Sequence, residues 1–596
     1  MVVGIGKCSH INRVERIDDV PVLIKMMQKM ELGKTIDNQL IVHGNWTGLS
    51  VGNLTEVLLS YILSEADHRL NKLEDWAMGR LYMLKALYPS SKIERTCFTD
   101  DKLELVLDYL SDMGKWDKIE QELNGKILRV YRLAKEEKGV KHLRVDATVG
   151  QSHKKAEKDG LFQFGSSKHF NPKLTQFKTM LSTLDTQISG CSYPLCSVTV
   201  SGNTSDDVLY IPIIEKSKQS LAATDKLLII GDKKMGSKRI RTHIVNDGDY
   251  YLTPLTKIQV PTSAILDLVK EAETELGKIQ IIELEGKKIG EGFWYEQEQT
   301  AELVIQDKIK LVKWVERRAV VRSEGYILSQ KAALERRISK TQAALDYLLV
   351  KKQGKQTPKT RKEIQQAVSG ILEKYQVKDY FNVSLKQKTS TKKVRGYGSK
   401  PDRSIKKVTF SLQIRLLQDQ IETAIDNYGW CVYATNAPEE LLTLTDAVQL
   451  YREQFQIESR FNDLKNKVTK LLPIYLQKDN RIKSLINLMM VGLKVICAIE
   501  VKVAQALKKQ GQELAGIYAG NPTRKSKKPS AKMLLSRFKE ISISIFLEND
   551  KPILFALTTV DTIQLEILKL LGLPVDLYNQ IIAQLNSIFL SNFKRT

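Results

Sequence analysis

Two apolar runs that each carry an aspartate most constrain the fold of this chain. The first run, LRVDAT, contains Asp146, and the second, KLLIIGD, ends at Asp232. LRVDAT belongs to the first of three short β-rich runs. A helical stretch follows them, then KLLIIGD, a second helical stretch and the strand-like DYYLTPL. Three strands followed by helix, strand, helix and strand predict an α/β fold with a mixed sheet.

The two aspartates are candidate functional residues because of where the strands are expected to end. In an open α/β sheet, ligands bind beyond the carboxyl ends of the strands, where such side chains project. Each aspartate, taken alone, also fits a turn or a helix N-cap. Asp146 and Asp232 therefore indicate a functional site only if a third residue completes it.

A helix expected over residues 446–467 supplies that third residue. At about 100° per residue, four of its side chains fall on one stripe. They are Tyr451, Gln454, Glu458 and Lys465. Glu458 also lies near the apolar line that contains Phe455, so we expect its carboxylate on the buried side, where it needs a metal or a cationic partner. Pairing with Arg460 or Lys465 is the alternative.

The composition of the chain limits the classes of molecule that it is expected to bind. The chain has 596 residues, enough for three or four domains, and 92 Lys+Arg against 69 Asp+Glu give a net charge of +23. Such a charge favours nucleic acid or an anionic membrane surface. The longest apolar stretch, 485–498, is interrupted by Asn487 and Lys494 and is shorter than the roughly 20 residues of a spanning helix. We expect no membrane segment, a cytoplasmic location and reduced cysteines.

The positive charge is concentrated between residues 351 and 410. This stretch holds 17 Lys+Arg against 4 Asp+Glu, an excess of 13. It is either a solvated linker or a surface that contacts DNA phosphates. The run over 386–407 contains Gly, Ser and Pro, which predicts a flexible basic loop. Its candidate DNA-binding residues are Lys392, Lys393 and Arg395.

These motifs together resemble those of a known family. A Tyr, a polar residue, a Glu and a Lys at the spacing of residues 451, 454, 458 and 465 resemble the YREK signature of bacterial insertion-sequence DDE transposases. The segments around Asp146 and Asp232 resemble the first two acidic motifs of that family. Further segments follow in the family's order, among them MLSTLD, SGNTSDD, GDYYLTPL and YATNAP. Gln454 departs from the pattern, because the family has Arg there.

The resemblance implies an RNase H-like core and a set of site residues. Asp146, Asp232 and Glu458 would be the catalytic metal ligands for Mg²⁺ or Mn²⁺, with two ions expected. The resemblance places Tyr451 and Lys465 at DNA phosphates, and the residue at 454 at the DNA end. Trp294, in EGFWY, would stack on a displaced base, although a position in the core is the alternative.

The resemblance also implies a domain order and an activity. We expect a helical region that recognises DNA ends (1–135), a first core part (136–256), a β-rich then basic helical insertion (257–436), a second core part (437–510) and a helical C-terminal region for dimerisation (511–596). The expected activity is cleavage of the element's terminal inverted repeats in double-stranded DNA and strand transfer into target DNA, by a dimer on DNA. Alternatives are a catalytically silent DNA-binding derivative and an RNase H-fold nuclease without strand transfer.

Overall fold

The structure is a computed structural model that describes residues 11–165, 173–222, 224–305, 307–395, 397–398, 403–548 and 550–590. The chain divides into two compact units. Unit 1 comprises Met1–Thr253, Gln299–Trp314 and Leu450–Thr596, and unit 2 comprises Pro254–Glu298 and Val315–Gln449.

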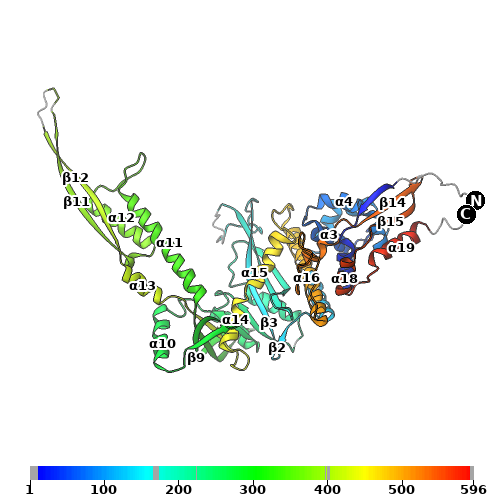
Figure 1. Cartoon of the computed structure of the whole chain (residues 1–596), viewed down its shortest axis with the longest axis horizontal. Helices are drawn as coiled ribbons and strands as arrows, with labels where there is room; N and C mark the ends of the chain where they lie inside the picture. Colours follow the sequence, from blue (N-terminus) through cyan, green and yellow to red (C-terminus); the bar gives the residue numbers. More distant parts are fainter. Residues whose placement is uncertain are drawn as a thin grey trace, which may run out of the picture. The chain divides into compact units, whose positions relative to one another are not determined.

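Unit 1 contains a five-strand part of a mixed sheet. The strands are β3 (Val140–Ser152), β4 (Thr175–Asp185), β5 (Ser192–Ser201), β6 (Lys226–Gly231) and β7 (Tyr250–Pro254). They lie in the order β5-β4-β3-β6-β7, with β4 antiparallel to both neighbours and with β3, β6 and β7 parallel. Helix α8 (Tyr210–Gln219) precedes β6, and α9 (Lys238–Asn246) precedes β7. This order confirms the mixed α/β class (Figure 1).

The region expected to form one helix over residues 446–467 is divided instead. Helix α14 (Leu444–Arg452) ends, α15 (Phe455–Asn462) begins after two residues, and η3 (Asp463–Lys467) continues as a π-helix. The backbone N–H of Gln454 bonds to the carbonyl of Tyr451, in a tighter turn than an α-helix makes. The prediction of one continuous helix was therefore wrong.

A buried arginine explains the break between α14 and α15. Arg144, on β3, is fully buried, and its Nη1 donates to the carbonyl oxygen of Leu450 at 2.6 Å. That carbonyl would accept from Gln454 in an unbroken α-helix. The guanidinium also donates to both oxygens of Asp185, at 2.7 and 2.8 Å, so the break is fixed to the central sheet.

The two ends of unit 1 are joined by a small sheet. Strand β1 (Ile11–Arg16) pairs with β14 (Ser542–Glu548), which pairs with β15 (Lys551–Leu557). The sequence analysis had not predicted these strands. The helices of this N- and C-terminal part are α1 (Val20–Lys29), α2 (Leu32–Gln39), α3 (Val51–Glu65), α4 (Leu70–Met78), α5 (Leu81–Leu87), α6 (Asp100–Tyr109), α7 (Met113–Tyr131), α17 (Ala531–Ser536), α18 (Thr562–Leu571) and α19 (Leu577–Phe589).

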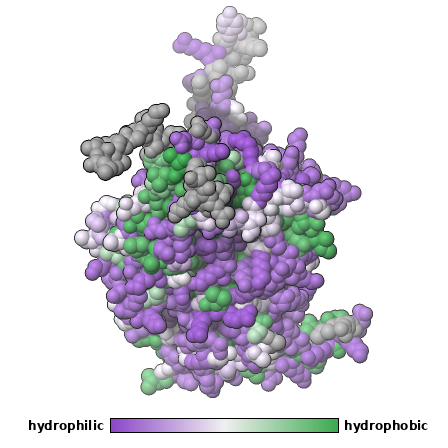
Figure 2. Space-filling model, turned by 90° about the vertical axis from the view of Figure 1, so that its right-hand side faces the viewer, coloured by the Kyte–Doolittle hydropathy of each residue, from purple (hydrophilic) through white to green (hydrophobic). Residues whose placement is uncertain are grey.

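One long helix forms the centre of unit 1. Helix α16 (Asp479–Gln510) is, among the residues that the structure describes, long and apolar enough to cross a membrane, but 94% of its most apolar window is buried within the fold. Its hydrophobic character is therefore explained by packing. The face of the molecule in Figure 2 is largely hydrophilic, with apolar residues in small separate patches, as is usual for a surface in water.

Unit 2 begins with α10 (Thr262–Thr274) and contains the neighbouring strands β13 (Trp430–Thr435), β10 (Lys308–Ser323), β9 (Lys287–Ile305) and β8 (Gln280–Leu284), in that order. Parts of β9 and β10 belong to unit 1. The remaining helices of unit 2 are α11 (Glu324–Leu348), α12 (Arg361–Lys374) and α13 (Gln418–Asp426).

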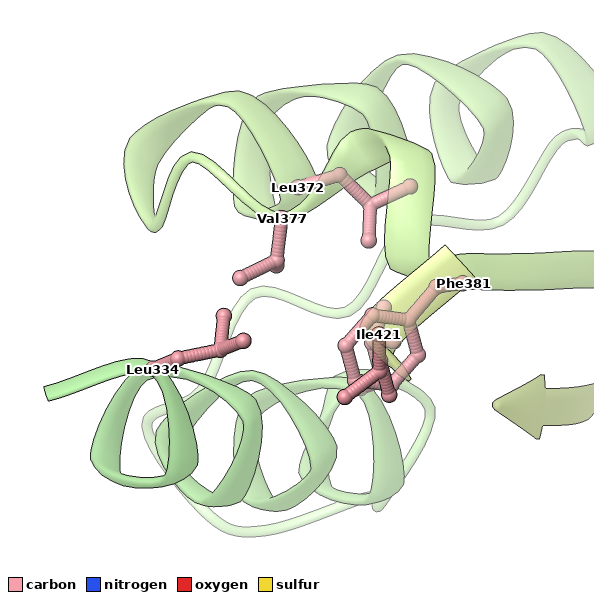
Figure 3. Close-up of a cluster of buried hydrophobic side chains, with 6 residues drawn as sticks. Leu334, Leu372, Val377, Phe381 and Ile421 are labelled. Atoms are coloured by element: carbon pink, nitrogen blue, oxygen red, sulfur yellow. The ribbon is translucent and has the colours of Figure 1, made fainter. Parts of the chain in front are cut away.

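A two-stranded ribbon replaces the flexible loop expected over residues 386–407. Strands β11 (Phe381–Val394) and β12 (Arg403–Leu416) pair without interruption and extend past α11 and α12 in Figure 1. Their base is held by a separate apolar core, in which Leu334, Leu372, Val377 and Phe381 point toward one another together with Ile421 (Figure 3). The prediction of a flexible loop was wrong for the paired residues, because β-branched and apolar side chains alternate along both strands.

Candidate active site

The two aspartates lie at the same level on neighbouring parallel strands. Val145 of β3 is paired with Gly231 of β6, so the next residues along each strand, Asp146 and Asp232, are side by side. Both are partly exposed. The expectation that Asp146 ends its strand was wrong: β3 continues to Ser152 because it pairs with β4 along this whole length. The two carboxylates therefore sit where β6 ends and β3 continues.

Several groups donate hydrogen bonds to Asp232. The hydroxyl of Tyr210 on α8 donates to its Oδ1 at 2.5 Å, and the backbone N–H of Lys234 donates to the same oxygen at 2.8 Å. The Thr253 hydroxyl donates to the Asp232 backbone carbonyl at 2.8 Å. Burial, and then the charge of Asp232, raise the pKa of Tyr210 far above its usual value, so this phenol remains a proton donor to the carboxylate.

Glu458 lies on α15, and its side chain is exposed rather than on the buried side as expected. The break before α15 explains this difference, because α15 does not continue the buried side of α14. Phe455, expected on the same buried side, is likewise 54% exposed. Within the described ranges, no three His, Cys, Asp or Glu side chains lie close enough together to hold a metal ion. The structure thus brings Asp146 and Asp232 together and does not gather Glu458 with them.

Helix α15 is fixed in place by Arg460, two residues after Glu458. This buried guanidinium donates to Asp463 at 3.1 Å, to Glu500 of α16 at 3.2 Å and to the Cys191 sulfur at 3.5 Å. The expected alternative partner of Glu458 is thus engaged elsewhere. Because Arg460 is buried and points toward α16, Glu458 extends toward solvent on another side of the helix.

The remaining stripe residues occupy different environments. Lys465 donates to the Thr148 hydroxyl at 2.5 Å and to the Val149 carbonyl at 2.6 Å, which ties η3 to β3 just beyond Asp146. Tyr451 is partly exposed at the end of α14. Both polar atoms of the Gln454 side chain are buried and have no hydrogen-bond partner among the residues described. Gln454 is thus the residue of this stripe whose polar groups are unsatisfied.

Unit 2 contains the other candidate DNA-binding residues. Trp294 on β9 is partly buried against the apolar cluster that contains Ala319 and Val448, and the Arg317 guanidinium lies 4.2 Å from the centre of its ring. Lys393 and Arg395 are exposed near the end of β11. Lys392 is in β11, but its side chain lies outside the described residues.

Sequence reasoning missed two residues that shape the site. Tyr210, which positions Asp232, stands in an apolar helical segment where a core aromatic is the ordinary interpretation. Arg144 stands two residues before Asp146, and a charged residue inside an otherwise apolar strand was a signal that went unused.

The central part of the chain matches a known protein family. A family model described as "Transposase DDE domain" matches residues 142–491, more than half of the chain. The chain belongs to this family of DDE transposases. The match begins within β3 and ends within α16, and it includes Asp146, Asp232 and Glu458. No curated protein matched the chain. The protein is therefore a transposase with an RNase H-like mixed α/β core, in a family that generally uses divalent metal ions.

Proposed function

We propose that this transposase binds the ends of a mobile DNA element and catalyses metal-dependent strand cleavage followed by strand transfer into target DNA. The observation that carries the proposal is the pairing of β3 with β6, which puts Asp146 and Asp232 side by side within the region that the family model matches. Two adjacent carboxylates that are open to solvent suit phosphoryl transfer, in which the protein supplies positioning and charge stabilisation.

The donor set fits a hard divalent cation. Carboxylate oxygens are the ligands that Mg²⁺ and Mn²⁺ prefer. We assign Asp146 and Asp232 to hold these ions, two of which are expected, and Glu458 as the third ligand contributed from α15. When bound, such ions activate a water or 3′-hydroxyl and stabilise the leaving oxygen. The exposed Glu458 side chain is available for this role, whereas a buried ion pair would have removed it.

The other residues of the site would orient the reactants. Tyr210 holds one oxygen of Asp232 and leaves the other available to a ligand. Lys465, placed beside β3 by Thr148 and Val149, would lie near a DNA phosphate and act as a point charge. Tyr451 would contact a neighbouring phosphate. Gln454, whose buried amide is unsatisfied, would find its partner in the bound DNA end.

Further parts of the chain would bind DNA and a second subunit. We assign recognition of the terminal inverted repeats to residues 1–135, and pairing of two subunits on DNA to residues 511–596. The core would be formed by 136–256 and 437–510, with 257–436 as the insertion. In this insertion, Trp294 would stack on a displaced base, and the basic residues Lys392, Lys393 and Arg395 would contact phosphates.

A catalytically silent DNA-binding derivative is the second candidate. One observation favours it: no three-carboxylate group is gathered within the part of the chain that the structure describes. A nuclease without strand transfer would have the same carboxylates and would differ only in its products.

The test is cleavage of a labelled duplex that carries the element's own ends, with Mg²⁺ or Mn²⁺. Wild type would be compared with Asp232→Asn, Glu458→Gln and a control, Glu566→Gln, which removes the same charge from α18. We expect the wild type and the control to cut at the element boundary, and the two site variants to bind without cutting. If the wild type binds the element's ends tightly and specifically but neither it nor any variant cuts them, the silent derivative is supported. Cleavage without joined products would support the nuclease.

A further inference from the structure

The ribbon β11–β12 forms a sheet of its own. Its register is continuous from the Phe381–Leu416 pair to the Val394–Arg403 pair, and it contains no third strand among the described residues. In a two-stranded ribbon, successive side chains point to opposite faces, and residues directly opposite each other share a face. The register therefore assigns each side chain to one of two faces.

One face is apolar and anchored at the base of the ribbon. Phe381 is buried in the core cluster of Figure 3, and Val383 and Ile414 pack against the same cluster. Farther along this face, Leu385 and Leu412 are paired and half-buried. The base of the ribbon therefore uses this face to attach to the helices of unit 2.

The other face, here called the polar face, has a different composition. Its described members are all exposed and include no carboxylate and no apolar side chain. They are Asn382, Ser384, Lys386, Lys388 and Ser390 of β11, and Lys407, Thr409, Ser411, Gln413 and Arg415 of β12. None of its four cations forms an ion pair with a described residue. The polar face thus combines unpaired positive charge with hydroxyl and amide groups along two strands.

Such a face fits the major groove of duplex DNA. The groove admits a two-stranded β-ribbon, and its base edges accept and donate hydrogen bonds to side chains such as Asn, Gln and Ser. Its walls are phosphates, which Lys and Arg neutralise.

We propose that the polar face of β11–β12 lies in the major groove of duplex DNA during transposition. The proposal rests on the DNA-binding function proposed above and adds the element and the face that bind. It assigns the cations of the face to the phosphates along the groove. It assigns the short polar side chains between them, Ser384, Ser411 and Gln413, to the base edges.

Two adjacent lysines provide a matched test. Lys407 is on the polar face and is paired with Ser390, whereas Lys406 is on the opposite face and is paired with Thr391; both are exposed. Binding of the full chain to a labelled duplex would be measured over a range of salt concentrations for wild type, Lys407→Ala and Lys406→Ala. We expect Lys407→Ala to lower the slope of log K against log salt by about 0.9, and Lys406→Ala to change it much less. Equal changes in the two variants would overturn the proposal.

A second measurement tests the groove. Guanine N7 faces the major groove, so methylation at N7 blocks proteins that enter it. We expect interference with wild-type binding that is lost in a variant with Ser384, Ser411 and Gln413 all changed to Ala. An unchanged interference pattern in this variant would overturn the proposal even if the chain binds DNA. Failure of the wild type to bind any duplex would instead overturn the DNA-binding function itself, and this proposal with it.

Discussion

The guanidinium of Arg144 on β3 donates to the backbone carbonyl of Leu450 at 2.6 Å, across 306 residues of sequence. The same side chain forms a double hydrogen bond with Asp185 and an ion pair with Glu453 at 3.1 Å. Burial raises the pKa of Asp185, but hydrogen bonds from His142 and Arg144 outweigh it and leave this pKa below its usual value. The strand of Asp146 and the end of α14 are thus fixed to one buried ion pair.

Arg144→Met is therefore expected to destabilise unit 1 by about 3–5 kcal/mol, because it leaves the Asp185 carboxylate buried without its cationic arginine partner. The measurement is the free energy of unfolding in urea. Adding Asp185→Asn to Arg144→Met removes the unpaired charge and should recover part of the loss. If the double variant is as unstable as the sum of the two single variants, the two side chains are not coupled.

Tyr210→Phe removes the hydroxyl that donates to Asp232 and leaves the ring in place. A hydrogen bond to a charged group contributes about 1.5–3 kcal/mol, so we expect cleavage of the element's ends to slow by about 10- to 100-fold. Tyr193→Phe is the matched control, because this buried tyrosine donates to the neutral Asn124 at 3.0 Å. Equal rates for the two variants would show that Tyr210 does not position Asp232 for the reaction.

Gln454→Met replaces a buried amide without a described partner by an apolar side chain of similar shape. The unsatisfied groups cost about 1–3 kcal/mol, so the variant should be more stable than wild type by an amount in that range. Cleavage of the DNA end should fall at the same time if the amide binds DNA. Gln456→Met is the comparison: the Gln456 Oε1 is also buried without a described partner, but its Nε2 donates to Glu453 at 3.2 Å, so this change should stabilise the fold less. Lower stability of Gln454→Met would show that the amide has a partner within the protein.

Stability should also decrease between about pH 4.5 and pH 7 through Glu56. Burial raises the pKa of this carboxyl from 4.5 to about 7, despite hydrogen bonds from Tyr88 and Gly33. The folded protein therefore retains a proton that the unfolded chain releases, and the stabilisation present below pH 4.5 is lost as the pH rises through 7. The contribution is about 3 kcal/mol.

Glu56→Gln, which cannot ionise, should remove this part of the pH dependence and raise stability at pH 8. Urea unfolding at pH 5, 6, 7 and 8 measures the slope. A slope in the variant equal to that of wild type would show that Glu56 does not retain its proton in the fold.

Local patterns in the sequence were sufficient for the order of strands and helices in the core. Apolar runs such as KLLIIGD form β6 because their side chains are buried on both faces of a sheet, and this property can be read residue by residue. The motif spacing indicated the DDE transposase family, which the family match confirms. The metal ligands and DNA contacts remain proposals.

Tertiary structure alone decided which side of a helix or strand each residue occupies. Helical periodicity placed Glu458 beside Phe455 on a buried side, but Arg144 takes the Leu450 carbonyl and interrupts the helix, so both residues are exposed. Likewise, Gly, Ser and Pro predicted a loop over 386–407, but pairing of β11 with β12 produced a ribbon with two different faces. In both cases the deciding hydrogen bonds join residues that are distant in sequence or depend on a strand register, and neither is encoded in a local pattern.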